Sequence, residues 1–206
     1  MSTSQPRIYL ASQSPRRREL LHQIGINFDS LLLRNDPRRN LDVDETPDEN
    51  EAPVDYVQRI SRAKAEAGWK ALALRKLHLF PVLAADTTVT LNNRIFGKPR
   101  DREDAVAILR ELSGRQHQVL SAVAVAFGER IELRLSTTAV TFAALSEDRI
   151  YRYVQTNEGH DKAGAYGIQG LAGAFVQRIE GSYSGVMGLP LCETVEILHS
   201  FGHPVP

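Results

Sequence analysis

Apolar and polar residues alternate at the start of this chain in a pattern that predicts a strand, a tight turn and a helix. An apolar run at residues 8–11 gives way to a polar turn at residues 12–14, and apolar side chains then recur at helical spacing until Gly25. Ser14 is a favourable N-cap, and Pro15 occupies the first helical position, where proline is well tolerated. The free N–H groups of such a helix end attract anions, and a capped surface helix with a solvated basic face is the alternative.

The next segments predict a second strand at residues 28–33, a long acidic loop at residues 34–53 and a helix from Val54. One stripe of this helix faces the protein, and it comprises Val57, Ile60, Lys64, Ala67 and Ala71. Buried lysines are rare without a partner. Lys64 therefore either reaches an inward partner, which we favour, or extends from the edge of the stripe to water.

A continuous apolar run at residues 81–85 is typical of a strand covered on both faces, and Asp86 and Thr87 follow it. We expect Asp86 at the end of this strand, because ligands of open α/β sheets gather beyond strand ends. There its carboxylate could reach a metal ion or a water molecule. The alternative is an aspartate that caps a turn.

The rest of the chain predicts further helices and a pair of long antiparallel strands. The expected elements are a returning strand at residues 95–96, a helix capped by Asp101, strands at 117–127 and 130–142, a helix capped by Ser146, a strand near 174–179 and a helix at 191–199. Between the last two helices lies a glycine-rich run at residues 161–170, which permits close approach of the backbone to a ligand. This run matches neither a Walker A loop nor a dinucleotide fingerprint, so a plain connector is equally compatible with it.

Composition restricts the partners that the protein can have. The chain has 206 residues, 42% hydrophobic and 24% charged, as expected of one soluble globular domain. Its formal net charge of zero argues against binding to nucleic acid or to an anionic membrane surface. The single cysteine, Cys192, lies in the predicted last helix, where we expect an inert packing role. A lone cysteine and the lack of an apolar leader or membrane-length run predict a cytoplasmic protein.

Several polar residues have no evident role in the predicted strands and helices, and their chemistry suits phosphoryl transfer. Arginines at residues 16–18, Lys64 and Lys98 could hold a polyphosphate, while Asp86 and a carboxylate of the acidic loop could hold a hard divalent metal through oxygen. No set of serine, histidine and acid stands out for acyl transfer, and the six histidines are scattered.

Several motifs also resemble a known family. The chain contains, in order, LASQSPRRRELL, VDE, ADTTV, GKP, LSGRQH, DKAGAYGIQG and GLPL. This series resembles the Maf family of nucleoside triphosphate pyrophosphatases, and the SPR turn with a glutamine in the glycine-rich run is similar to the branch that acts on dTTP and UTP. The resemblance implies a single domain with two lobes around a central cleft and a mixed, strongly twisted sheet with flanking helices. It also implies a homodimer and cleavage between the α- and β-phosphates with Mg²⁺ or Mn²⁺.

The resemblance further implies roles for individual residues. Asp86 is the expected general base for the attacking water. Phosphate and metal positions match Ser12, Arg16, Glu45, Lys64 and Lys98, with the metal between Asp86 and Glu45, and base-selecting positions match Arg16, Thr87 and Gln169. Helical spacing alone places Arg17 nearer than Arg16 to the apolar stripe of its helix.

Two departures from the family and two rival functions stay open at this stage. Ala63 stands where relatives often have Glu or Gln, and the stretch at residues 34–41 is longer than usual, which bears on the assignment of Glu45. The rivals are a nucleotide-binding regulator of cell division without turnover and a purine-selective pyrophosphatase of the inosine triphosphate type. A panel of nucleotides and metals distinguishes these functions.

Overall fold

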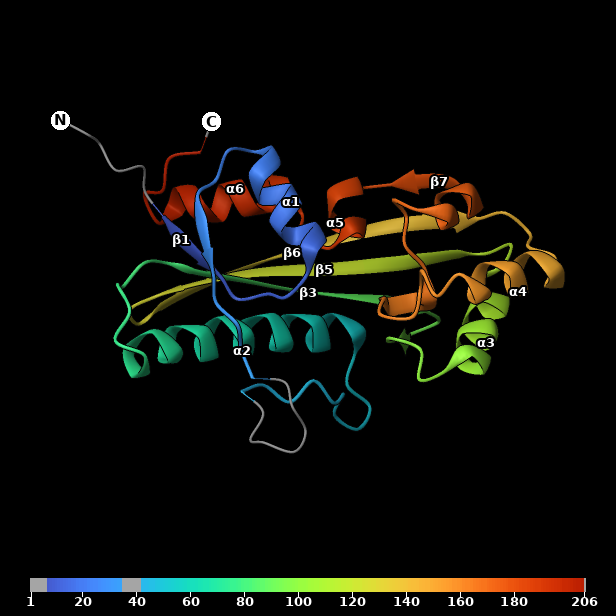
Figure 1. Cartoon of the computed structure of the whole chain (residues 1–206), viewed down its shortest axis with the longest axis horizontal. Helices are drawn as coiled ribbons and strands as arrows, with labels where there is room; N and C mark the ends of the chain where they lie inside the picture. Colours follow the sequence, from blue (N-terminus) through green and yellow to red (C-terminus); the bar gives the residue numbers. More distant parts are fainter. Residues whose placement is uncertain (1–6, 35–41, 206) are drawn as a thin grey trace.

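A computed structural model describes residues 7–34 and 42–205 of the chain. Within these ranges one sheet of seven strands runs the length of the molecule, with helices on both faces (Figure 1). The strands are β1 (Ile8–Leu10), β2 (Phe28–Ser30), β3 (Val82–Leu91), β4 (Arg94–Phe96), β5 (Gln116–Phe127), β6 (Arg130–Phe142) and β7 (Val176–Glu180). The helices are α1 (Pro15–Gln23), α2 (Pro53–Leu74), α3 (Arg102–Leu112), α4 (Glu147–Gln155), α5 (Tyr183–Met187) and α6 (Leu191–Ser200), with 3₁₀ turns η1 (Ala163–Ala165) and η2 (Leu171–Phe175).

The sheet combines a short parallel part with a long antiparallel part. Its order is β2-β1-β3-β5-β6-β7, and β4 pairs with β3 outside this path. β1 is parallel to both β2 and β3, whereas the other pairings are antiparallel. The expected mixed sheet with flanking helices is therefore confirmed.

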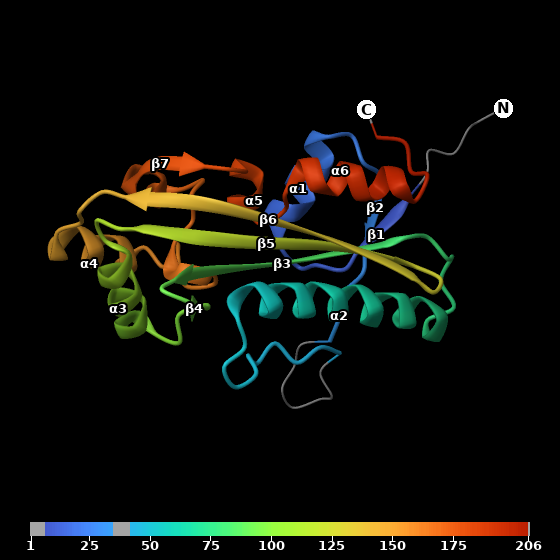
Figure 2. The same cartoon turned by 180° about the vertical axis from the view of Figure 1, so that it is seen from behind.

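The hydrophobic core is divided between the two ends of the long sheet. At one end α1 and α6 pack on one face through Leu21 and Ile197, and α2 covers the other face through Leu72 (Figure 2). At the other end α3 and α4 pack together with η1 and η2 against β5 and β6, around Leu109 and Phe142. These two ends are the two lobes, and the middle of the sheet joins them.

Local capping signals set the helix starts as expected. The side chains of Ser14, Asp101 and Ser146 each accept a hydrogen bond from the backbone N–H three residues later, at the starts of α1, α3 and α4. No helix in the two described ranges is long and apolar enough to cross a membrane.

Three features differ from the sequence-based expectations. Asp86 does not end a strand, because β3 continues through it to Leu91 and Asp86 pairs with Ala122 of β5. Cys192 has no packing role, since it lies on the exposed side of α6. The short helix α5 was not expected, and it lies between β7 and α6, against β5 and β6.

Candidate functional site

The candidate site lies at an opening in the sheet beside the end of β1. β1 pairs with β3 only at Val82 and Leu83, and β4 pairs with β3 only from Val89 onward. No described strand pairs with that edge of β3 between these two points. Asp86 and Thr87 occupy this opening. They lie in the middle of β3, and the strand that ends beside them is β1. The prediction that Asp86 lies at the end of its own strand was therefore wrong.

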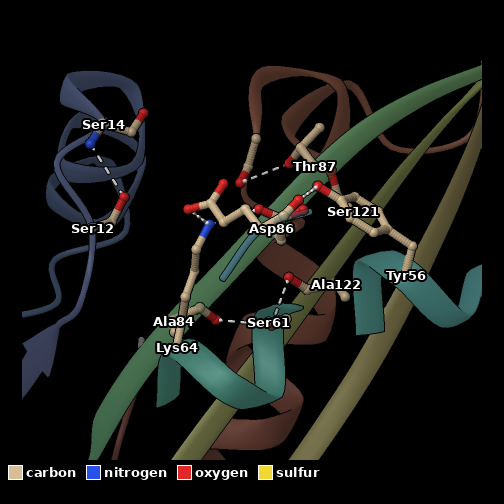
Figure 3. A network of polar contacts seen from close by, with 12 residues as sticks. Ser12, Ser14, Tyr56, Ser61, Lys64, Ala84, Asp86, Thr87, Ser121 and Ala122 are labelled. Atoms are coloured by element: carbon tan, nitrogen blue, oxygen red, sulfur yellow. Dashed lines mark hydrogen bonds and ion pairs between the residues drawn. The ribbon is translucent and has the colours of Figure 1, made fainter. Parts of the chain in front are cut away.

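Lys64 joins two carboxylates at this opening. Its Nζ atom lies 2.8 Å from Oδ1 of Asp86 and 2.9 Å from Oε1 of Glu45. Figure 3 shows the lysine extending from α2 toward Asp86 on the neighbouring strand. The side chains of Lys64 and Asp86 are only 14% and 10% exposed, whereas that of Glu45 is 48% exposed. The inward position expected for Lys64 is confirmed, and the structure brings Glu45, Lys64 and Asp86 together.

The close approach of α2 to the sheet makes this contact available. Gly68 lies one helical turn after Lys64 on the same side of α2, and it is buried. A Cβ atom at Gly68 would lie 2.7 Å from Val82 and 3.3 Å from Ala11, so only glycine fits without a shift. Because residues four apart lie one above the other on a helix, this contact also brings Lys64 close to β3.

The surroundings of Lys64 combine two carboxylates with the phenol of a half-buried tyrosine. Two carboxylates face one ammonium group, and the hydroxyl of Tyr56 donates to the backbone carbonyl of Glu45 at 3.0 Å. The pKa of Tyr56 is raised above its ordinary value, first by burial and then by the charges of Asp86 and Glu45. The influence of the two carboxylate charges therefore extends to the half-buried ring of Tyr56.

The donor set at this opening fits a divalent metal that is shared with a substrate. Asp86 and Glu45 supply carboxylate oxygens, which hard cations prefer. The described residues contain no cluster of three or more histidine, cysteine, aspartate or glutamate side chains that could hold a metal unaided. Magnesium is commonly bound by one or two carboxylates together with substrate phosphates, so a pair of carboxylates is sufficient.

A second polar network lies on the opposite face of β3. Thr87, the residue after Asp86, turns its side chain to this face because successive side chains of a strand alternate. The Thr87 hydroxyl lies 2.8 Å from that of Ser121 on β5 (Figure 3). Ser121 donates to the carbonyl of Gly185 in α5 at 2.7 Å. The carboxylate site and this network therefore lie on opposite faces of β3 at neighbouring residues, Asp86 and Thr87.

Arg17 ties the start of α1 to this network. It donates from Nε to the carbonyl of Gly188 at 2.8 Å, from Nη1 to Ser12 at 3.2 Å and from Nη2 to Thr87 at 3.5 Å. Burial lowers the pKa of the Arg17 guanidinium, and the charge of Asp86 opposes this effect. Sequence reasoning gave Arg17 no role, although its helical position had indicated that it faces the interior.

Arg16 and Gln169 meet at a separate cavity beside the network. Arg16 donates from Nε to the carbonyl of Met187 at 3.2 Å. Arg16, Lys162, Tyr166, Gln169 and Met187 are among the residues that line the cavity, whose volume is about 280 Å³. This volume accommodates one small ring system, and the predicted base-selecting residues Arg16 and Gln169 both line it.

Internal contacts shape the glycine-rich wall of this cavity. The carboxylate of Glu158 accepts hydrogen bonds from the backbone N–H groups of Leu171 and Ala172 at 2.9 and 3.3 Å. A Cβ atom at Gly170 would lie 2.4 Å from this carboxylate, so a larger residue there would have to displace the Glu158 side chain from these hydrogen bonds. Internal hydrogen bonds therefore hold the end of the glycine-rich run in place beside the cavity.

Two predicted site residues are less well defined by contacts. Ser12 lies at the corner and accepts from the backbone N–H of Ser14 and from Arg17, both at 3.2 Å. Lys98 is exposed, and it makes no hydrogen bond or ion pair with another residue in the described ranges. Its neighbour Gly97 accepts a hydrogen bond from Gly164, which joins this turn to the glycine-rich run. Most of the unusually long stretch at residues 34–41 lies outside the described residues.

The chain is similar to several known proteins. The dTTP/UTP pyrophosphatase of Dechloromonas aromatica is 54% identical over 196 residues, which are 95% of this chain and 98% of that protein. The dTTP/UTP pyrophosphatase of Aromatoleum aromaticum is 53% identical over 206 residues and 100% of both chains. The structure of the Staphylococcus aureus Ham1 protein aligns with a TM-score of 0.49 and 18% identity, covering 95% of this chain and 97% of that one. A family model described as Maf-like protein matches residues 7–201, and the chain belongs to this family.

Proposed function

We propose that this chain is a nucleoside triphosphate pyrophosphatase that hydrolyses dTTP and UTP to the monophosphate and pyrophosphate. The relatives named above support the substrate class through 53–54% identity over nearly the whole chain. The observation that carries the proposal is the ammonium group of Lys64 between the carboxylates of Glu45 and Asp86 at the open edge of β3. This group of charges combines a general base, a cation and a metal-binding pair within one opening.

The carboxylate side of the opening would perform the chemistry. A divalent cation, Mg²⁺ or Mn²⁺, held by Asp86 and Glu45 would offset the negative charge of the triphosphate. Asp86 would accept a proton from the water that attacks the α-phosphorus, and the bond to the pyrophosphate oxygen would break in line with that attack. Lys64 and Lys98 would stabilise the charge on the departing pyrophosphate.

The other side of the opening would bind the rest of the nucleotide. Ser12 and Arg16 at the start of α1 would contact phosphate, because the turn presents a hydroxyl, a guanidinium and a helix N-terminus together. Arg16, Thr87 and Gln169 would select the base, and the cavity of about 280 Å³ that Arg16 and Gln169 share supports this role. A pyrimidine ring would enter this cavity with its polar edge toward these side chains.

The assembly and the compartment are also part of the proposal. We propose a homodimer, which is supported by the exposure of the apolar side chains of Leu74 and Leu77 near the end of α2. Sedimentation equilibrium at several concentrations measures the mass directly. We propose a cytoplasmic location, supported by a single exposed thiol, Cys192, that has no partner for an internal disulfide.

One assay tests the activity. Release of pyrophosphate is measured for dTTP, UTP, CTP and ITP, each with Mg²⁺, with Mn²⁺ and with excess chelator. We expect release from dTTP and UTP with metal and none with chelator. Preference for ITP would contradict the proposed substrate class. Tight nucleotide binding without pyrophosphate would instead indicate a non-catalytic nucleotide-binding protein.

A further inference from the structure

A chain of hydroxyl groups behind the candidate site fixes the direction of its hydrogen bonds. Ser121 is completely buried on β5, directly opposite Thr87 on β3. Its Oγ atom lies 2.7 Å from the carbonyl oxygen of Gly185 and 2.8 Å from the Thr87 hydroxyl. A carbonyl oxygen cannot donate, and two oxygens at 2.7 Å without a proton between them repel each other. The single proton of Ser121 therefore points to Gly185.

This assignment also determines the proton of Thr87. A hydroxyl has one proton and two lone pairs. Because Ser121 has given its proton to Gly185, the short contact with Thr87 requires that Thr87 donates to Ser121. The other nearby acceptor is the carbonyl of Gly188, at 3.4 Å, and it too belongs to the protein. In both arrangements the Thr87 hydroxyl offers only lone pairs to a ligand, and Arg17 approaches from the side as a further donor at 3.5 Å.

An obligate acceptor at Thr87 restricts what can lie over it. Phosphate oxygens are acceptors as well, so the triphosphate has nothing to donate to Thr87. The group that Thr87 recognises must have an N–H or O–H bond, which places the nucleoside part on this face of β3 and the phosphates near Asp86 and Lys64. Thr87 contacts Gly188, and the preceding residue Met187 lines the cavity that Arg16 and Gln169 share. The nucleobase is therefore the nearest candidate.

We propose that Ser121 is a positioning residue that holds the Thr87 hydroxyl as an acceptor toward the nucleobase, so that the site favours bases with an N–H donor. Uracil and thymine present a donor at N3, whereas cytosine presents an acceptor at N3. A like-to-like contact of two acceptors is unfavourable, because each loses its hydrogen bond to water without gaining another. This inference rests on the proposed function and extends it to discrimination between UTP and CTP.

The test compares two nucleotides on the same protein sample. In Ser121→Ala the Thr87 hydroxyl loses its short acceptor at 2.8 Å and keeps only the carbonyl of Gly188 at 3.4 Å, a weak hydrogen bond that its proton can leave to rotate toward the ligand. We expect the ratio of kcat/KM for UTP to that for CTP to fall about tenfold. A freely rotating Thr87 hydroxyl can donate to N3 of cytosine as well as accept from N3 of uracil, and one hydrogen bond is worth about this factor. The ratio does not depend on the folded fraction, because both substrates meet the same enzyme.

Two further variants make the test specific. Ser61→Ala is the matched control, since Ser61 is also completely buried and donates to a backbone carbonyl, that of Ala122, without contacting Thr87. Its ratio should equal that of the wild type. Thr87→Val removes the acceptor with little change in shape and should lower the ratio by itself. Adding Ser121→Ala to Thr87→Val should change the ratio no further, because Ser121 acts through Thr87.

The outcomes separate this inference from the proposed function. A wild-type protein that releases no pyrophosphate from UTP contradicts the proposed function itself. An active wild type with an unchanged ratio in Ser121→Ala overturns the inference, as does an equal loss for UTP and CTP, which would indicate contact with the sugar. If Ser121→Ala does not fold, the Thr87→Val variant decides: an unchanged ratio of kcat/KM for UTP to that for CTP in this variant also overturns the inference.

Discussion

At the scale of single residues, the carboxylate of Asp86 is the group on which the proposed chemistry depends most directly. Asp86→Asn preserves the shape of the side chain but removes its charge and its ability to accept a proton from water. General-base assistance is typically worth about 10²- to 10⁴-fold in rate, so kcat for dTTP should fall by at least the lower figure. Asp48→Asn is a matched control, because Asp48 is an exposed acid whose charge faces Arg59. Near-full turnover in Asp86→Asn would contradict the assignment of the base.

The three arginines at the start of α1 differ in what they contact, and this gives a second residue-scale prediction. Arg16 lines the cavity and donates to Met187, whereas the exposed side chain of Arg18 makes a long contact of 3.5 Å with the carbonyl of Gln13. Arg16→Glu should therefore raise KM for UTP far more than Arg18→Glu does, because only the first places a carboxylate against the bound nucleotide. Steady-state kinetics of the two variants provide the comparison. Equal effects of the two variants on KM would contradict a binding role for Arg16 and would indicate that the start of α1 is a solvated basic surface.

At the scale of elements, the packing of α2 on the sheet decides where Lys64 lies. Gly68→Ala improves helix propensity by about 1 kcal/mol, but it introduces a methyl group 2.7 Å from Val82. Overpacking of this kind typically costs about 1–3 kcal/mol, so we expect a net loss in the free energy of unfolding, measured by urea denaturation. Turnover should also fall, since a shifted α2 moves Lys64 from Asp86. Gly97→Ala, with no atom within 4 Å of the added Cβ, is the control. A more stable Gly68→Ala protein would contradict this reasoning.

The elements also show how far sequence alone could predict this protein. Signals within a few residues were reliable, as the caps Ser14, Asp101 and Ser146 demonstrate, because capping depends on neighbouring backbone groups. The position of Asp86 was wrong because the length of β3 depends on its pairing with β5, which is distant in sequence. The short helix α5 contains a glycine and two polar residues at its start, so no periodic pattern identifies it.

The same distinction applies to the candidate site. Lys64 was found because a lysine on an apolar stripe is unusual, and the structure provides its two partners. Arg17 had a recognisable angular position but no visible partner, since Gly188 and Thr87 lie far away in the sequence. Ser121 had no signal, because a small polar residue within an apolar strand is common and its significance depends on the contact with Thr87.

At the scale of the whole molecule, a buried histidine links stability to pH. His117 is 1% exposed in the core of the lobe that contains α3 and α4, where Nε2 contacts the hydroxyl of Tyr166 at 2.9 Å and Nδ1 has no partner among the described residues. Burial lowers its pKa to about 4. The imidazole is therefore neutral in the folded protein throughout the mildly acidic range, packed against the rings of Phe142 and Tyr166.

The direction of the pH effect follows from proton binding. In the unfolded chain His117 has an ordinary pKa of about 6.5 and binds a proton as the pH falls below that value, whereas the folded protein resists protonation until about pH 4. Its stabilising contribution is hence complete above pH 6.5 and is lost between pH 6.5 and pH 4, by about 3 kcal/mol in total. Burial lowers the pKa of His203 as well, so that residue adds to the loss in the same direction.

A comparison of variants isolates the part due to His117. The carboxylates with lowered pKa values, such as Asp104, lose their contribution only at more acidic pH, so they act below most of this window. In His117→Leu the free energy of unfolding, measured by urea denaturation at pH 7.5, 6.0 and 5.0, should depend less on pH than in the wild type, even though the variant is less stable at pH 7.5 because Tyr166 loses a partner. His78→Gln, an exposed position, should retain the wild-type slope. A wild-type slope in His117→Leu would show that His117 does not resist protonation in the folded state, and the acid sensitivity of the protein would then originate outside this lobe.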